Sequence, residues 1–285
     1  MRLPCANMRC TSNYWRRADP RGRTSGMNNT ASGSAWSYDA IADVYASDMG
    51  QSMPFDDVGW YRALCQRECG DCGRVLELGC GTGRILIELL RAGIDAIGAD
   101  RSLPMLARLR KDAGKDVVPK VVQMDIAAPA LCAPFRVILL PYSLITYLRD
   151  PVAAAAAVRR IAALLETAGC LVLDAFVPRP VTTFAEFRRD YRRAHGDGVL
   201  ERHKRITVNA DGTNRIERRY RVFAADGELR DEFSTEETIR PYDHCELIEL
   251  GTAAQLDIES GVWDYGQQDD SAAARFATVV LRKRD

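Results

Sequence analysis

The chain of 285 residues has no excess of charge of either sign, because 39 lysines and arginines balance 39 aspartates and glutamates. A neutral chain has no long-range field that attracts a polyanion, so nucleic-acid binding would need a local basic patch. Long hydrophobic runs are missing too. The longest, such as Val137–Leu140 and Val152–Val158, fall far short of the roughly 20 apolar residues in a membrane-spanning helix. Both absences argue against nucleic acid and membrane as partners.

The first 35 residues are rich in Arg, Ser, Thr and Asn and contain no apolar stretch of the kind found in secretory signals. They predict a disordered basic tail. Its arginines leave a transit peptide or a nucleic-acid-binding arm open, and Met8 and Met27 also allow an upstream-extended start codon.

Nine cysteines are unevenly spaced, and some lie within apolar runs, as Cys132 and Cys170 do. This usage is typical of reduced intracellular thiols rather than of a disulfide framework, and it predicts a cytoplasmic protein.

Short apolar strands alternate with amphipathic helices from residue 38 to residue 176. The expected strands are Arg74–Leu78, Asp95–Ala99, Lys120–Met124, Phe135–Leu140 and Cys170–Phe176. The expected helices are Tyr38–Tyr45, Val58–Cys65, Ile85–Gly93, Pro104–Lys111 and Pro151–Glu166. Such alternation predicts an α/β fold with a doubly wound, mostly parallel sheet.

After Pro178 the pattern changes to strands joined by hairpin turns. The expected strands are Val199–Val208, Arg215–Phe223 and Leu229–Ile239, with turns at residues 209–212 and 225–227. A helix near Tyr242–Ala254 and two antiparallel strands, Leu256–Trp263 and Arg275–Arg282, then complete a seven-stranded sheet. The predicted organisation is a core of residues 36–178 and 241–285 with an antiparallel insert at 179–240, which acts as a lid or an oligomer contact; a homodimer is therefore possible.

A glycine-rich turn, Gly79-Cys80-Gly81-Thr82-Gly83, follows the first expected strand and opens a helix. This arrangement points backbone N–H groups and a helix N-terminus toward a ligand. A dinucleotide fingerprint would need a small residue where Arg84 stands, and a phosphate-binding P-loop would need Lys followed by Ser or Thr after the last glycine. The first interpretation is weakened and the second fails.

The segment VLELGCGTG resembles the first motif of class I S-adenosylmethionine-dependent methyltransferases. The resemblance implies S-adenosylmethionine as cofactor, with the glycine loop beneath its methionyl part. It also implies that Asp100 binds the ribose hydroxyls and that Asp125 lies near the adenine amine. The alternative for each of these two acids is that it caps the N-terminus of a helix. Glu77 would orient the loop or the cofactor amino group. Tyr38 and Tyr45 would close over the cofactor or pack in the core. The implied cofactor-binding residues are Tyr38, Tyr45, Glu77, Gly79, Cys80, Gly81, Gly83, Asp100, Arg101, Met105, Asp125, Ile126 and Pro141.

A second cysteine pattern competes with this interpretation. Cys65, Cys69 and Cys72 have the spacing by which radical enzymes hold an iron–sulfur cluster. They precede the first strand, however, and Asp71 stands where that family usually has an aromatic residue. The preferred interpretation is therefore an amphipathic helix face, and no metal is expected.

The methyl acceptor is expected above the carboxyl ends of the fourth and fifth strands, where open α/β sheets bind ligands. The segment PYSLITYL is similar to the corresponding part of glycine and amino-sugar N-methyltransferases, and the implied acceptor-binding residues are Tyr142, Tyr147, Asp174 and Phe176. Strand alternation puts Arg202 and Lys204 on one face and His203 on the other. His203 is the candidate catalytic base, with a solvated or packed histidine as the alternative.

The resemblance implies in-line methyl transfer to a small molecule. A neutral amine needs no strong base, whereas a phenol or alcohol benefits from one, so the missing base motif favours nitrogen. O-methylation of a phenol, alcohol or carboxylate stays open, as do a noncatalytic cofactor-binding domain and an NAD(P)-dependent oxidoreductase.

Overall fold

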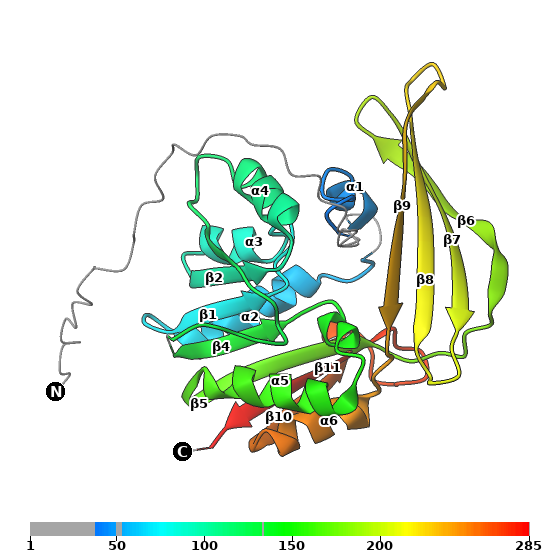
Figure 1. Ribbon diagram of the computed structural model, residues 1–285. Helices are drawn as coiled ribbons and strands as arrows, with labels where there is room; N and C mark the ends of the chain where they lie inside the picture. The colour runs from blue at the N-terminus through cyan, green and yellow to red at the C-terminus, as the bar shows by residue number, and fades with distance from the viewer. Residues whose placement is uncertain (1–37, 50–52, 133, 285) are drawn as a thin grey trace, which may run out of the picture. The chain divides into compact units, whose positions relative to one another are not determined.

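One central sheet organises the computed structural model, which describes residues 38–49, 53–132 and 134–284 (Figure 1). Its strands are β1 (Arg74–Leu78), β2 (Asp95–Asp100), β3 (Lys120–Gln123), β4 (Phe135–Leu140), β5 (Leu165–Phe176), β10 (Leu256–Trp263) and β11 (Phe276–Lys283). Their order is β10-β11-β5-β4-β1-β2-β3. Strands β1 to β5 pair in parallel, and β11 runs antiparallel to both β5 and β10. The predicted seven-stranded α/β fold is confirmed.

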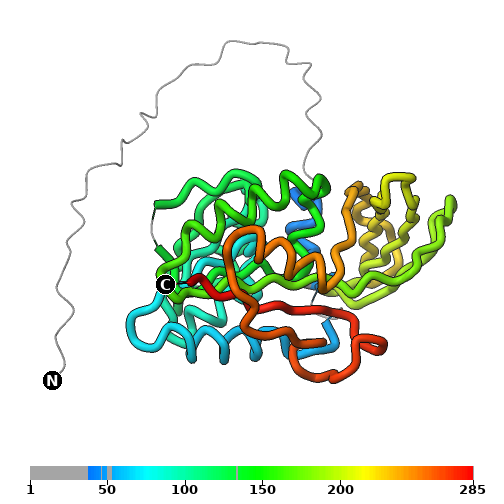
Figure 2. Tube along the Cα trace, turned by 90° about the horizontal axis from the view of Figure 1, so that it is seen from below, coloured from blue at the N-terminus to red at the C-terminus, as the bar shows by residue number. Residues whose placement is uncertain are grey.

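Helices cover both faces of this sheet (Figures 1 and 2). They are α2 (Asp57–Cys69), α3 (Leu86–Arg91), α4 (Leu103–Asp112), α5 (Pro151–Ala163) and α6 (His244–Ala253), whereas the short helix α1 (Tyr45–Met49) lies beside a second sheet. Helix α5 begins where Asp150 accepts a hydrogen bond from Val152 N at 2.7 Å, and Pro151 at its first position needs no hydrogen-bond acceptor. None of the described helices is both long and apolar enough to cross a bilayer.

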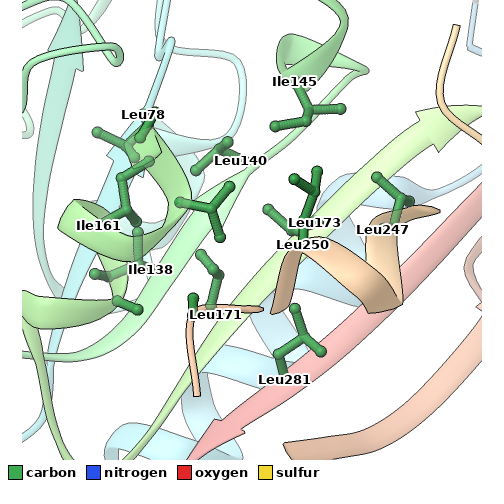
Figure 3. Close-up of a cluster of buried hydrophobic side chains, with 14 of the residues drawn as sticks. Leu78, Ile138, Leu140, Ile145, Ile161, Leu171, Leu173, Leu247, Leu250 and Leu281 are labelled. Carbon is green, nitrogen blue, oxygen red and sulfur yellow. The ribbon is translucent and has the colours of Figure 1, made fainter. Parts of the chain in front are cut away.

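Alternation along the strands divides the core into two layers. In β4, Val137 and Leu139 pack with α2, α3 and α4, whereas Ile138 and Leu140 face α5 and α6. Figure 3 shows the second layer, in which side chains from the sheet meet leucines and isoleucines of both helices. The two apolar faces explain why the strands of this sheet are almost continuously hydrophobic.

A second sheet contains β6 (Phe184–His195), β7 (Gly198–Val208), β8 (Asn214–Phe223) and β9 (Leu229–Ile239), paired antiparallel in that order. Glycines with φ of 81° and 88°, Gly212 and Gly227, form the predicted turns. Leu200 and Tyr220 pack against Ile41 and Val44, so one face of this sheet covers the segment around α1.

The helix predicted at Tyr38–Tyr45 was wrong. Residues 38–44 form successive turns rather than a helix, with Ile41 N bonded to Tyr38 O at 3.3 Å and Val44 N to Ile41 O at 3.0 Å. Here long-range contacts override helical periodicity: the hydroxyl of Tyr38 bonds to that of Tyr147 at 2.6 Å.

Helix α5 ends at Ala163 instead of Glu166, and β5 begins five residues before the predicted Cys170. Leu165 pairs with Phe135 at the start of β4, and Ala168 then takes a φ of 56° before regular pairing resumes at Cys170. The other strands of the central sheet agree with prediction within one residue.

Strand β6, which ends at His195, was not predicted. Two register shifts against β7 break the alternation of its side chains, so the sequence shows no period of two. The predicted tail, residues 1–35, lies outside the described residues.

Candidate active site

The glycine loop between β1 and α3 forms the floor of a cavity of about 220 Å³. Gly79 and Gly81 line it with φ of 68° and 52°, values that favour glycine. A Cβ on Gly79 would lie 2.6 Å from a side-chain carbon of Leu144, and one on Gly81 would lie 3.8 Å from the ring of Tyr45. Backbone therefore approaches the cavity without side chains in between, as a close-fitting ligand requires.

Most of the predicted cofactor residues line this cavity. They are Tyr38, Tyr45, Gly79, Gly81, Asp100, Arg101, Met105, Asp125, Ile126 and Pro141. Residues that were not predicted also contribute, namely Met124, Ala127, Leu144 and Leu148. They are apolar neighbours of predicted positions and carry no chemical signal of their own.

Asp100 ends β2 at the edge of the cavity. Its carboxylate accepts hydrogen bonds from Gly81 N at 2.9 Å and Ser102 N at 2.8 Å. Burial raises the pKa of Asp100, and these two backbone donors oppose the rise. Each carboxylate oxygen has a second lone pair, so Asp100 can still accept from two ligand hydroxyls.

Asp125 follows β3 and is half exposed. It accepts from Ala127 N at 2.9 Å and lies 3.9 Å from Arg101 Nη1. Asp125 therefore stabilises the turn after β3 and also lines the first cavity.

Three predicted cofactor residues do not reach the cavity. Glu77 is 2% exposed, and burial raises its pKa to about 8, while the backbone N–H of Leu86 opposes that rise. Cys80 is buried beside Gly98, and Gly83 faces Leu109 and Ile87. These three residues lie on the side of the turn that faces the core, so they hold the glycine loop against the sheet and α4.

A second cavity, of about 280 Å³, shares four tyrosines with the first: Tyr38, Tyr45, Tyr142 and Tyr147. The second sheet supplies its other wall, including Arg202, Arg218, Tyr220 and Glu237, and Phe176 and Asp48 line it from the core. The shared tyrosines therefore mark the place where the two cavities meet.

The acceptor-binding predictions have different outcomes. Tyr142, Tyr147 and Phe176 line the second cavity, and the rings of Tyr142 and Phe176 lie 5.4 Å apart. Asp174 does not, because it is fully buried and accepts from Tyr265 Oη at 2.8 Å, Ser143 N at 2.7 Å and Tyr61 Oη. Asp174 thus holds the turn in which Tyr142 and Ser143 have φ of 56° and 57°.

His203 lies on the face of β7 turned away from the second cavity, whereas Arg202 lines it. Its Nδ1 atom is 3.6 Å from Glu201 on the same face. The prediction that Arg202 and Lys204 share a face is confirmed, since both pair with Asp190, at 2.6 and 2.9 Å. The placement of His203 removes it from direct contact with a ligand in either cavity.

Ion pairs form much of the wall of the second cavity, and their residues were not among the predicted site residues. Asp48 is buried and accepts from Arg202 Nη1 at 2.7 and 2.8 Å, and Glu237 pairs with Arg218. Alternation placed each side chain on one of two faces, but no sequence signal showed which face meets the core.

The cysteine pattern is distributed between core and surface. Cys65 and Cys69 are buried in α2, and Cys72 is exposed. Burial raises the pKa of Cys69 to about 11, which favours a packed thiol over a thiolate ligand. The described residues contain no group of three His, Cys, Asp or Glu side chains placed to hold a metal ion.

Comparison with protein families matches residues 75–169 to the model described as "Methyltransferase domain". This stretch is therefore similar to methyltransferase domains. It extends from β1 through the glycine loop, Asp100 and Asp125 into β5. Comparison with curated protein sequences gives no match.

Solved structures with the same fold cover nearly all of this chain. The sugar N-methyltransferase KedS8 from Streptoalloteichus is 21% identical, with a TM-score of 0.69 over 93% of this chain and 100% of its own. CcbJ from Streptomyces caelestis is 23% identical, with a TM-score of 0.71 over 88% and 99%. The amino pentose methyltransferase CalS10 from Micromonospora echinaspora is 22% identical, with a TM-score of 0.66 over 84% and 96%.

The predicted resemblance to class I S-adenosylmethionine-dependent methyltransferases is therefore confirmed by domain and fold. CalS10 was solved with S-adenosylmethionine bound. In this chain the glycine loop and Asp100 line the first cavity, and the Asp100 carboxylate can accept hydrogen bonds from the hydroxyl groups of such a cofactor.

Proposed function

We propose that this chain transfers the methyl group of S-adenosylmethionine to an amine nitrogen of a small, polar molecule. The observation that carries the proposal is the pair of cavities that meet at four tyrosines. One cavity has the glycine loop and Asp100 for a cofactor, and the other has a polar wall for an acceptor.

The bound cofactor would supply a methyl group on a positively charged sulfur. Asp100 would accept hydrogen bonds from its ribose hydroxyls, and Tyr45 beside Gly81 would exclude water from the loop. The rings of Tyr142 and Phe176 hold the acceptor in the second cavity. The bound cofactor would offer its methyl carbon to the acceptor nitrogen, and the electron pair of the broken carbon–sulfur bond would stay on sulfur. Such alignment is worth about 7–11 kcal/mol in favourable systems.

Nitrogen is favoured because the groups around the second cavity make poor bases. The carboxylates of Asp48 and Glu237 are paired with arginines. Burial raises the pKa of Tyr142 to about 12 and that of Tyr147 further, so both phenols stay protonated at neutral pH. A neutral amine attacks without a strong base, whereas an alcohol needs one.

Support for an amino-sugar acceptor comes from the similar fold of KedS8, a sugar N-methyltransferase, and CalS10, an amino pentose methyltransferase. The second cavity of this chain combines paired charges, hydroxyl groups and aromatic rings, which suit a molecule with several hydroxyl groups and one amine.

The test has two parts. Calorimetry measures S-adenosylhomocysteine binding to the wild type, to Asp100→Asn and to Asp95→Asn. The last variant is the control, because it makes the same substitution at the opposite end of β2. Asp100→Asn should weaken binding about tenfold, because one charged acceptor is lost; Asp95→Asn should leave the affinity within twofold of wild type.

A panel of amino sugars, simple amines, phenols and carboxylic acids is then screened for S-adenosylhomocysteine release. Methylation confined to phenols or acids would refute the nitrogen assignment, and absence of binding would refute the cofactor assignment.

A further inference from the structure

Three side chains from distant parts of the sequence form a chain of short hydrogen bonds beside the junction of the two cavities. Tyr38 Oη lies 2.6 Å from Tyr147 Oη, which lies 2.6 Å from Glu237 Oε2. Tyr38 belongs to the segment before α1, Tyr147 ends a short 3-10 helix (Leu144–Tyr147), and Glu237 is on β9 of the second sheet. Both tyrosines line both cavities, and Glu237 lines only the second.

The direction of these bonds follows from their protons. Glu237 is 7% exposed and pairs with the guanidinium of Arg218, so its carboxylate accepts and has no proton to donate. Tyr147 must therefore donate to Glu237. A phenol has one proton, so the proton between the two tyrosines belongs to Tyr38. Any further hydrogen bond made by the oxygen of Tyr38 is then one that it accepts.

The phenols keep these roles at neutral pH. Burial raises the pKa of Tyr38 and of Tyr147 well above the usual range, so both carry their protons. The ring of Tyr38 is also fixed in direction by edge-on contacts with Tyr45 and Tyr147, at 5.9 and 6.0 Å between centroids. A fixed ring and a fixed proton together fix the direction of the oxygen lone pairs.

We propose that Glu237 is a positioning residue that acts through Tyr147 to turn the oxygen of Tyr38 into an acceptor for cationic or N–H groups at the junction of the cavities. This rests on the proposed function, in which a sulfonium methyl and an amine meet at that junction. An accepting oxygen there attracts the positive charge and takes a hydrogen bond from the amine N–H, which leaves the nitrogen lone pair free to face the methyl carbon.

Replacement of Glu237 by glutamine should reverse the chain. The amide oxygen would turn to Arg218 and its NH₂ group to Tyr147, so Tyr147 would donate to Tyr38 and the proton of Tyr38 would point toward the junction. Tyr147→Phe removes the group to which Tyr38 donates and leaves the Glu237–Arg218 pair in place. The two variants disturb the same function through different contacts.

The probes are two cofactor analogues, so the test needs no knowledge of the acceptor. Sinefungin carries an amine in place of the methylsulfonium, and S-adenosylhomocysteine has a neutral sulfur at that place. Calorimetry gives the dissociation constant of each for the wild type, Glu237→Gln, Tyr147→Phe and Glu236→Gln. The last is the matched control, because Glu236 precedes Glu237 on β9 and pairs with Arg215 at 2.7 Å on the other face.

The wild type and Glu236→Gln should favour sinefungin over S-adenosylhomocysteine by the same ratio. In Glu237→Gln and Tyr147→Phe this ratio should fall about tenfold through weaker sinefungin binding, the usual effect of one hydrogen bond to a charged group. The proposal would be overturned if the affinity ratio is unchanged in Tyr147→Phe, or if both analogues lose affinity equally. Glu237 and Tyr147 would then have only a structural role. If the wild type binds neither analogue, the proposed function fails and this inference with it. If Glu237→Gln does not fold, Tyr147→Phe decides alone.

Discussion

Asp48 attaches α1 to the second sheet, and its loss should be costly. Its side chain is 6% exposed. The carboxylate accepts from Arg202 Nη1 at 2.7 and 2.8 Å and from Tyr191 Oη, and Arg193 donates to its backbone oxygen at 2.6 Å. Asp48→Asn keeps the shape of the side chain but removes the charge that these donors face.

The magnitude follows from what Arg202 retains. Removal of one partner from a buried ion pair costs about 3–5 kcal/mol. Arg202 keeps a second carboxylate, Asp190, whose Oδ2 accepts from Nη2 at 2.6 Å and from Nε at 3.0 Å. We therefore expect the lower end, about 3 kcal/mol, which for a domain of this size lowers the unfolding temperature by about 6–12 °C.

Thermal unfolding followed by circular dichroism measures this effect. The control is Asp43→Asn, because Asp43 lies in the same segment and is 92% exposed in its surface pair with Arg108 at 3.2 Å. Surface pairs contribute about 0–1 kcal/mol, so this variant should melt within about 3 °C of wild type. Equal melting temperatures for the two variants would refute the view that Asp48 anchors α1.

Three further variants test other parts of the site. Burial raises the pKa of Glu77 to about 8, so the folded ligand-free protein keeps a proton that the unfolded chain releases above about pH 4.5, and stability falls as pH rises through this window. Glu77→Gln should match wild type in urea unfolding near pH 4 and exceed it at pH 9 by roughly 3–5 kcal/mol; parallel pH profiles would contradict this. Asp174→Ala leaves three buried donors unpaired and should lower the free energy of unfolding by about 3–5 kcal/mol in the same assay. A decrease under 1 kcal/mol would favour the earlier prediction that Asp174 binds the acceptor. His203→Ala should methylate the amine selected by the screen within twofold of the wild-type rate, and a hundredfold loss would restore it as the base.

The central sheet was predictable because its signals are local. β4 is bounded by Pro134 and Pro141, and the glycine loop follows β1 directly. Asp100 and Asp125 stand at strand ends, and parallel strands bring those ends to one edge of the sheet. The first cavity therefore contains most of the residues that the motif implied.

The second cavity was not predictable in the same way. Its wall comes from strands rich in arginine and glutamate, and alternation assigns these side chains to two faces without showing which one is covered. Asp174 illustrates a related limit, since its position at a strand end suggested a ligand contact, yet Tyr61 and Tyr265 from other elements enclose it.

The sequence by itself determined the α/β class, the glycine loop and the acids beside it, because strand pattern and turn chemistry are encoded within a few residues. Only the tertiary structure decided that β6 pairs with β7, that Arg202 rather than His203 meets the cavity, and that Tyr38, Tyr147 and Glu237 form one hydrogen-bonded chain. Those facts depend on which surfaces are buried against each other, and burial is a property of the whole fold.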